Sequence, residues 1–197
     1  MSQTDRVVYF VRHGQTDWNA EHRFQGNQDI PLNDFGRAQA RKNGQLLRTL
    51  ISDPEAWPFV SSPLIRARET LEIIRDEMGL ASADYRLHDD LREIEFGMFE
   101  GRTWAELKEL APDVVKGYRS DRWSYKPPGG ESYELLSERV ARWWHTVDRN
   151  FVVVAHGGVS RCLRGLIRPM DAAEIPRLET PQDKILKISN GDFEWIE

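Results

Sequence analysis

The chain has 197 residues, of which 40% are hydrophobic and 30% are charged, and its net charge at pH 7 is −5. This composition is typical of one globular domain with a sizeable core, and it excludes a disordered or fibrous protein. The negative charge argues against non-specific binding to nucleic acid or anionic lipid, and no apolar run is long enough to span a bilayer. Residues 1–6 are polar and lead directly into an apolar run, so we expect a cytoplasmic protein without a secretory leader.

The first predicted element is a buried strand over residues 7–11, a short run of β-branched and aromatic side chains. Arg12 and His13 follow it at once, and Gly14 allows a tight turn and a close approach to the main chain. Open α/β sheets bind ligands at the carboxyl ends of their strands, so a cation and an imidazole stand where a ligand is expected.

A polar loop over residues 21–31 comes next, and Arg23, Gln25 and Gly26 supply hydrogen-bond donors within it. The pattern then predicts a helix over residues 34–52 and a short strand over residues 57–61.

The following helix is expected to open at Ser62 and Pro63, with the proline in the first turn, and to end near Met78. Arg66 lies in its first turn, where free N–H groups favour anions.

Residues 87–101 form an irregular stretch with many carboxylates, and residues 103–122 have a helical pattern interrupted at Pro112. The loop over residues 125–132 contains two prolines and two glycines. We interpret residues 102–132 as a cap or lid inserted into a single domain that spans residues 1–197.

An amphipathic helix is predicted over residues 134–148, and residues 151–155 read as a strand buried on both faces. His156 and Gly157 follow this strand and open a helix that runs through residue 167. Asn190 and Gly191 indicate a closing hairpin. The expected fold is α/β, with a mostly parallel central sheet flanked by helices on both faces and a small helical cap over the cleft at the carboxyl ends of the strands.

Three strand-to-helix junctions therefore carry Arg12 with His13, Arg66, and His156 to the same sheet edge. Two arginines and two histidines at helix amino termini suit a tetrahedral dianion such as a phosphoryl group. His13 is then the expected nucleophile, with its other ring nitrogen donating to a carbonyl or carboxylate.

The leaving alkoxide also needs a proton, for which Glu93 is the leading candidate among several neighbouring carboxylates. Cys162 is the only cysteine, and we expect it to be a packed core thiol rather than a nucleophile.

These residues fall into four ordered blocks: VRHGQTDWN, SSPLIRARET, LREIEFGMFEG and VVAHGGVSR. Together they resemble the blocks of the histidine phosphatase superfamily, also called the phosphoglycerate mutase-like family. The resemblance implies that His13 is phosphorylated during turnover, that Arg12 and Arg66 hold the phosphoryl group, that Glu93 is the proton donor and that His156 contacts the phosphoryl oxygens. It also implies a phosphate pocket that includes Asn19, Arg23, Gln25, Gly26 and Gly157.

The chain departs from the mutases of this family at several positions. Phe96 stands where they carry a tyrosine, Trp104 stands where they carry a substrate-binding lysine, and Arg119 and Arg122 are separated rather than adjacent. The PPGGES loop, residues 127–132, resembles the phosphatase branch. We therefore expect a metal-independent phosphatase that uses no cofactor and acts on a small phosphorylated metabolite.

Several alternatives stay open at this point. The cluster of Arg12, His13, Arg66 and His156 can be a structural network of buried ions and histidines. The aromatic residues Trp104, Tyr118 and Trp123 can either pack within the cap or line a substrate pocket. A mutase primed by a bisphosphate and an inactive phospho-ligand binding module compete with the phosphatase. The substrate and the oligomeric state, a homodimer included, are left undecided.

Overall fold

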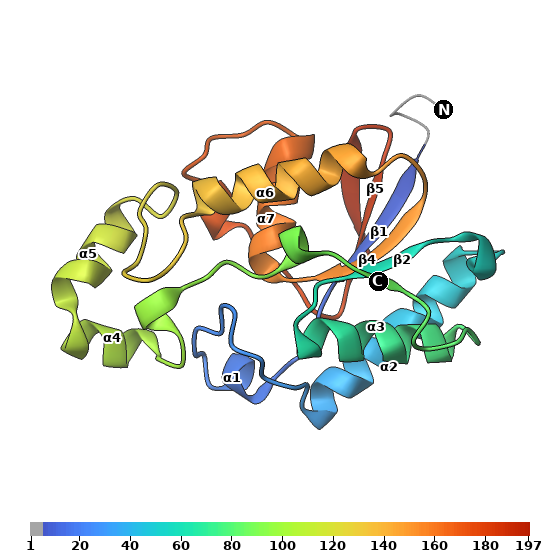
Figure 1. Cartoon of the computed structure of the whole chain (residues 1–197), viewed down its shortest axis with the longest axis horizontal. Helices are drawn as coiled ribbons and strands as arrows, with labels where there is room; N and C mark the ends of the chain where they lie inside the picture. Colours follow the sequence, from blue (N-terminus) through green and yellow to red (C-terminus); the bar gives the residue numbers. More distant parts are fainter. Residues whose placement is uncertain (1–5) are drawn as a thin grey trace.

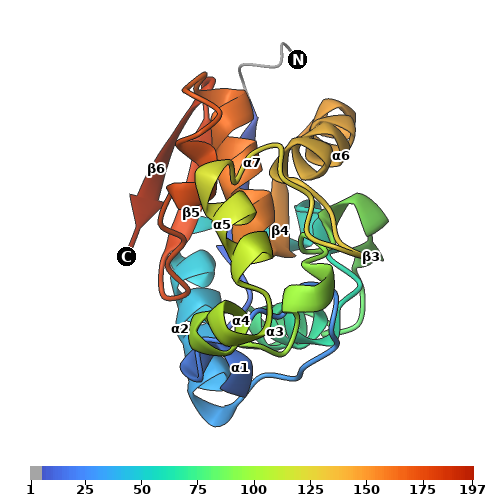
Figure 2. The same cartoon turned by 90° about the vertical axis from the view of Figure 1, so that its left-hand side faces the viewer.

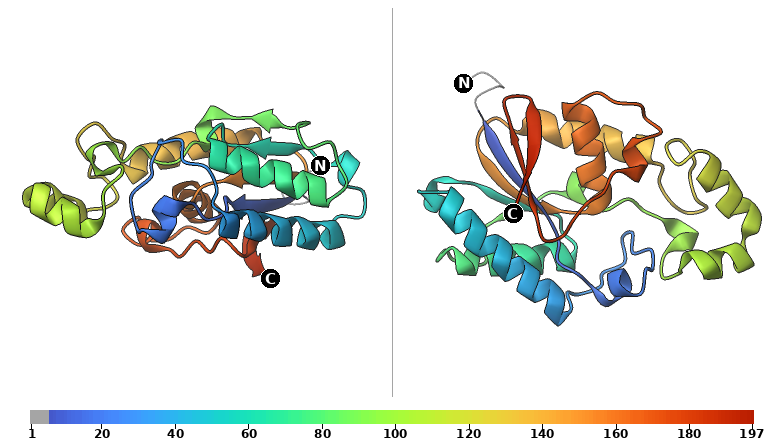
Figure 3. Two further views of the ribbon diagram at one scale, coloured as in Figure 1. Left: turned by 90° about the horizontal axis from the view of Figure 1, so that it is seen from below. Right: turned by 180° about the vertical axis from the view of Figure 1, so that it is seen from behind.

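The computed structural model describes residues 6–197. Within them lies a six-stranded sheet in the order β3–β2–β4–β1–β5–β6. The strands are β1 (Val7–Arg12), β2 (Phe59–Ser61), β3 (Arg86–Leu87), β4 (Phe151–Ala155), β5 (Ile185–Ser189) and β6 (Asp192–Ile196). The strands β3, β2, β4 and β1 are parallel to one another. The antiparallel hairpin of β5 and β6 adds to this sheet at the β1 side, where β5 pairs antiparallel with β1 (Figure 3).

The helices are α1 (Asp17–Ala20), α2 (Asp34–Leu50), α3 (Ile65–Glu77), α4 (Trp104–Leu110), α5 (Pro112–Ser120), α6 (Tyr133–Thr146) and α7 (Gly157–Ile167). Four 3₁₀ turns connect them: η1 (Pro54–Ala56), η2 (Asp89–Leu91), η3 (Gly97–Phe99) and η4 (Ile175–Arg177). No helix within residues 6–197 is both long and apolar enough to cross a membrane.

Alternation along the central strands produces a core on each face of the sheet. Val8 and Phe10 of β1 pack with α6 and α7, whereas Tyr9 and Val11 pack with α2 and α3. Figure 1 shows these helix pairs on opposite sides of the sheet. Successive side chains of a strand point to opposite faces, so a continuous apolar run fills both cores and the predicted α/β fold is confirmed.

Helices α4 and α5 lie apart from the sheet at one end of the molecule, facing the viewer in Figure 2. They are separated at Ala111, directly before the proline that the sequence marks as an interruption. Their own small core is Phe99, Leu107, Val115 and Tyr118, against which Phe24, Phe96, Trp104 and Tyr125 pack.

Two local predictions need correction, and two short elements escape the sequence pattern. Strand β2 begins at Phe59 rather than at residue 57, because Pro58 lacks an N–H group and the preceding chain forms η1. Helix α3 begins at Ile65, after Pro63 rather than around it, because Leu64 is extended, with ψ of 137°. The one-turn helix α1 and the two-residue strand β3 were not predicted, since neither is long enough to show a hydrophobic period.

Candidate functional site

His13 follows β1 directly and is buried. Its backbone N–H donates to the Ala155 carbonyl of β4 at 3.0 Å, which extends the parallel pairing by one residue. Its ring Nδ1 lies 2.7 Å from the Gly14 carbonyl. Since a carbonyl only accepts, Nδ1 carries the proton and Nε2 keeps a free lone pair in the neutral ring.

Gly14 is required by a close contact with α2. A Cβ atom at Gly14 would lie 2.9 Å from the Cα of Gly36 and would overlap the Gly36 carbonyl. The Gly14 N–H donates to Thr70 Oγ1 at 3.0 Å, and the Thr70 hydroxyl donates to the Arg66 carbonyl at 2.7 Å. Helix α3 therefore holds the turn that carries His13.

His156 follows β4 as the N-cap of α7 and is fully buried. Its ring centroid lies 5.2 Å from that of His13. Its Nε2 shares a 2.7 Å hydrogen bond with Ser62 Oγ at the end of β2, while its buried Nδ1 has no partner among the described residues. Burial is the larger cause, and the positive charge of Arg66 the second, that hold the pKa of both histidines well below the usual range.

Arg66 is fully buried in the first turn of α3. Its guanidinium donates to the carbonyls of Gly26 and Gln28, each at 2.7 Å, and so ties down the loop before α2. Arg12 donates to the Thr180 carbonyl at 2.6 Å. Burial lowers the pKa of each arginine to about 10, so both stay cationic at neutral pH.

Both arginines also keep a buried Nε without a hydrogen-bond partner in the described part of the chain. Buried donors are normally satisfied, so these two groups suit an anionic ligand.

Glu93 is half-buried in the segment between β3 and α4. Its two carboxylate oxygens lie 3.0 and 3.2 Å from the backbone nitrogen of Gly158, in the first turn of α7, and Oε1 also accepts from the N–H of Ile94 at 2.9 Å. A side chain at Gly158 would overlap this carboxylate. The amino terminus of α7 therefore orients the Glu93 carboxylate.

The predicted pocket loop lies around this cluster. Asn19 closes a capping box with Thr16, and Gly26 has a φ of +54° and presents its carbonyl to Arg66. Gln25 is buried, with Oε1 unpartnered within residues 6–197. A Cβ at Gly157 would lie 3.0 Å from Thr180 Oγ1 and 3.5 Å from Arg12 Nε.

Arg23 is oriented differently from these residues. Its guanidinium binds Glu21 at 2.7 Å, Glu106 at 2.8 Å and the Gly101 carbonyl at 2.8 Å, which joins the loop to the start of α4. In this structure the carboxylates of Glu21 and Glu106 neutralise the charge of Arg23. Its expected role in holding phosphate stays a prediction.

Several residues of the site were given no role in the sequence analysis. Ser62 bonds His156, Thr180 bonds Arg12, and Gln182 donates to the His13 carbonyl at 2.9 Å and to Asn19 Oδ1 at 3.2 Å. Two of them come from the loop between α7 and β5, which has no regular pattern. Only the packing of that loop against β1 reveals their role.

Arg161 is a further cation that the sequence analysis missed. It lies one turn after Gly157 on α7, on the same helix face, and donates to the Tyr133 hydroxyl at 3.0 Å and the Leu178 carbonyl at 2.7 Å. The nearby charge of Arg161 contributes to the lowered pKa of Arg12, next to the larger effect of burial. The i,i+4 helical spacing from Gly157 was the available signal.

The aromatic residues of the cap mainly pack on one another. Trp104 contacts Phe24 and Tyr118, with ring centroids 4.9 and 5.9 Å apart, and the Arg119 guanidinium lies 5.0 Å from the Trp104 ring. Tyr118 is buried, and burial raises the pKa of its phenol. These contacts favour packing for Trp104 and Tyr118.

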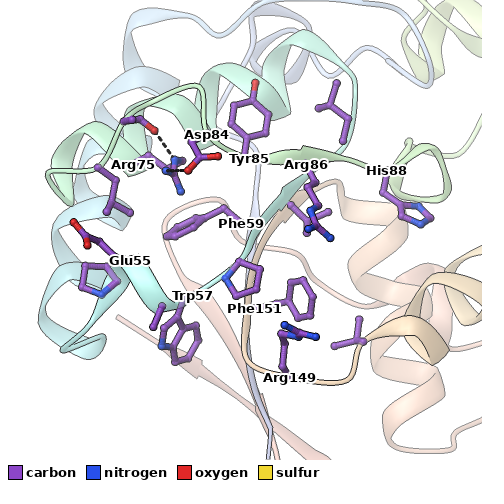
Figure 4. Close-up of a pocket in the computed structure, with 18 of the residues that line it drawn as sticks. Glu55, Trp57, Phe59, Arg75, Asp84, Tyr85, Arg86, His88, Arg149 and Phe151 are labelled. Atoms are coloured by element: carbon purple, nitrogen blue, oxygen red, sulfur yellow. Dashed lines mark hydrogen bonds and ion pairs between the residues drawn. The ribbon is translucent and has the colours of Figure 1, made fainter.

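A separate cavity of about 920 Å³ opens at the opposite, amino-terminal end of the strands (Figure 4). Trp57, Phe59 and Phe151 form part of its wall, and Arg75 reaches into it while paired with Asp84 at 3.8 Å. His13, His156 and Glu93 do not line it. It is therefore distinct from the histidine–arginine cluster.

Cys162 is on the buried face of α7, and burial raises the pKa of its thiol. The prediction of a packed core thiol is confirmed.

A neutral imidazole with a free Nε2, two buried guanidinium groups, a second imidazole and a carboxylate thus converge where the parallel strands end. The sequence matches the family model of the histidine phosphatase superfamily (branch 1) over residues 8–196, and the chain belongs to this superfamily. The predicted family resemblance is confirmed.

Named relatives include phosphatases and a mutase-like protein. The phosphoglycerate mutase-like protein 4 of Arabidopsis thaliana is 32% identical over 191 residues, covering 94% of this chain and 80% of the relative. The mycobacterial glucosyl-3-phosphoglycerate phosphatase is 29% identical with a TM-score of 0.77, covering 97% of this chain and 96% of that one. The α-ribazole phosphatase of Shigella flexneri is 23% identical with a TM-score of 0.80, covers 96% and 94% of the two chains, and shows the shared fold.

Proposed function

We propose that this protein is a phosphomonoesterase that hydrolyses a small phosphorylated metabolite through a phosphohistidine on His13. The observation that carries the proposal is the His13 ring, whose Nδ1 is bound to the Gly14 carbonyl at 2.7 Å. This contact leaves Nε2 as the nucleophile in a buried site that holds two cations.

In the first step, Nε2 of His13 attacks phosphorus, and the bond from phosphorus to the ester oxygen breaks. Arg12, Arg66 and His156 stabilise the charge on the equatorial oxygens. Glu93, protonated at this stage, gives its proton to the leaving oxygen, which departs as an alcohol.

In the second step, the ionised Glu93 takes a proton from water as the water oxygen attacks the phosphohistidine. The phosphorus–nitrogen bond breaks, inorganic phosphate leaves, and both His13 and Glu93 return to their starting states. The residues named here carry out both steps without a metal ion.

Hydrolysis is favoured over a mutase reaction by the cap. Phe96 and Trp104 both pack against Phe24, with ring centroids 4.9 Å away in each case. These apolar rings stand where the resemblance places a tyrosine and a substrate-binding lysine in the mutases. The similarity to a glucosyl-3-phosphoglycerate phosphatase also supports the hydrolase.

The test is release of inorganic phosphate from a panel of phosphomonoesters, with a chelator present and no bisphosphate added. The expected result is turnover that falls by about three orders of magnitude or more in His13→Ala, together with loss of the acid-labile phosphoenzyme. His145→Ala, which removes an exposed histidine on α6, is the matched control and should keep full activity. Substantial phosphate release by His13→Ala would exclude the proposed nucleophile, and activity only with a bisphosphate primer would identify a mutase.

A further inference from the structure

Arg139 of α6 holds the backbone of the segment that carries Glu93. Its Nη1 donates to the carbonyls of Asp90 at 2.8 Å and Arg92 at 2.7 Å, and its Nη2 donates to the carbonyl of Glu93 at 2.9 Å. In Figure 1 this green segment runs beneath α6 towards the cap. One guanidinium therefore satisfies three carbonyls, one in the 3₁₀ turn η2 and two in the irregular stretch that follows it.

Glu131 fixes the orientation of that guanidinium. Its carboxylate accepts from Nε and Nη2 of Arg139, each at 2.9 Å, in a bidentate pair. The two side chains are only 13% and 16% exposed, so the pair is shielded from solvent. The Glu131 N–H also donates to the Glu95 carbonyl at 2.7 Å, which binds the far side of the same segment.

The two glycines before Glu131 allow this arrangement. A Cβ at Gly130 would lie 2.6 Å from the Glu95 carbonyl oxygen, and the Met98 N–H donates to the Pro128 carbonyl at 3.0 Å. The PPGG loop therefore lies flat against the backbone of residues 95–98. Any side chain at position 130 would overlap this backbone, so the loop that carries Glu131 would have to shift.

Glu93 is thus fixed at both ends. Arg139 holds its carbonyl, and the Gly158 N–H holds its carboxylate at 3.0 Å. A general acid must stay within hydrogen-bond reach of the leaving oxygen, and a shift of about 1 Å lowers its effectiveness strongly.

We propose that Arg139 and Glu131 are positioning residues that hold Glu93 in place for proton transfer to the leaving group. The inference rests on the proposed phosphomonoesterase activity. It predicts that disturbing the pair impairs protonation of the leaving group more than attack by His13.

The test compares two esters in Glu131→Gln and Arg139→Lys. Glycerol 2-phosphate has an alkoxide leaving group that needs a proton, whereas p-nitrophenyl phosphate has a phenolate that leaves without one. The comparison uses kcat/KM, which reports the steps up to departure of the leaving group and not the later hydrolysis of the phosphohistidine. We expect kcat/KM for glycerol 2-phosphate to fall by about tenfold or more, and kcat/KM for p-nitrophenyl phosphate to change by no more than about twofold. Thermal unfolding of each variant confirms that it is folded.

A double-mutant cycle separates positioning from general support of the fold. In the Glu93→Gln background the acid is already absent, so adding Glu131→Gln should lower kcat/KM for glycerol 2-phosphate by less than about twofold. Arg142→Gln is the matched control, because it removes an exposed ion pair of 3.1 Å between α6 and the Asp90 side chain of the same segment. It should leave the ratio of the two activities unchanged.

Equal losses on both esters, additive effects with Glu93→Gln, or unchanged kinetics in both variants would each overturn the positioning role while leaving the phosphatase intact. An unmodified protein that releases phosphate from neither ester would overturn the phosphatase, and the inference with it, before any variant is compared.

Discussion

The chemistry of His13 depends on its burial beside two cations. Removing the ring from water and placing Arg66 and Arg12 nearby disfavour the imidazolium form and hold the pKa of His13 well below its usual range. The ring therefore stays neutral under conditions in which an exposed histidine would be protonated. The same two arginines attract the dianion that the neutral ring attacks.

Replacement of Glu93 tests the proton donor at the scale of one residue. Glu93→Gln keeps the side-chain shape but cannot give up a proton, so it should lower kcat/KM for alkyl esters by about a hundredfold and kcat/KM for phenolate esters far less. Steady-state kinetics on a series of esters with graded leaving-group pKa values measures this difference. Equal losses across the series would assign the acid to another carboxylate, and Glu95→Gln, at an exposed neighbour, is the control.

At the scale of elements, the site depends on how closely α2 approaches the turn after β1. Gly36, in the first turn of α2, lies against the backbone of Gln15, where a Cβ would stand 2.6 Å from the Gln15 nitrogen. Asn33 caps this helix through its side chain, which accepts from the Gly36 N–H at 2.9 Å. Two glycines, one on each segment, therefore set the distance between the helix and the turn that carries His13.

Gly36→Ala should consequently destabilise the protein. Alanine is normally favoured over glycine in a helix by about 1 kcal/mol, but here the overlap with rigid backbone should cost about 1–3 kcal/mol instead. Denaturant unfolding monitored by circular dichroism measures the change. Arg48→Ala, at an exposed position of the same helix, should alter the free energy of unfolding by less than about 0.5 kcal/mol. A more stable Gly36→Ala variant would contradict the contact.

At the scale of the whole molecule, two buried neutral histidines link stability to pH. The pKa values of His13 and His156 lie well below 6.5 in the folded state, whereas the unfolded chain titrates both rings near 6.5. Below pH 6.5 the unfolded state therefore binds more protons than the folded state. The stabilisation is fully present above pH 6.5 and is lost as the pH falls towards the folded-state values.

The melting temperature should accordingly fall between pH 7.5 and pH 5.5. Each histidine contributes a slope of up to about 1.4 kcal/mol per pH unit once the pH is well below 6.5. Thermal unfolding at several pH values, in the intact protein and in His156→Asn, gives the two slopes. The melting temperature of the variant should depend less steeply on pH than that of the intact protein. Identical slopes would show that His156 is not the group that titrates.

Much of the site could be predicted because its members stand next to strong local patterns. His13 and His156 each follow an apolar strand, and Arg66 stands near the start of an amphipathic helix. The supporting residues Thr180 and Gln182 lie in a loop without periodicity, so only the closure of the chain brings them to Arg12 and His13.

The sequence by itself determined the α/β class, the order of the main elements and the sheet edge at which the histidines and arginines meet, because apolar periodicity and strand polarity are local properties. The tertiary structure alone decided which atoms face one another. The bond from Gln182 to the His13 carbonyl, the anchoring of Glu93 on α7 and the bond from Arg139 to the Glu93 carbonyl each join segments that are far apart along the chain. They form only when side chains pack and buried polar groups find partners.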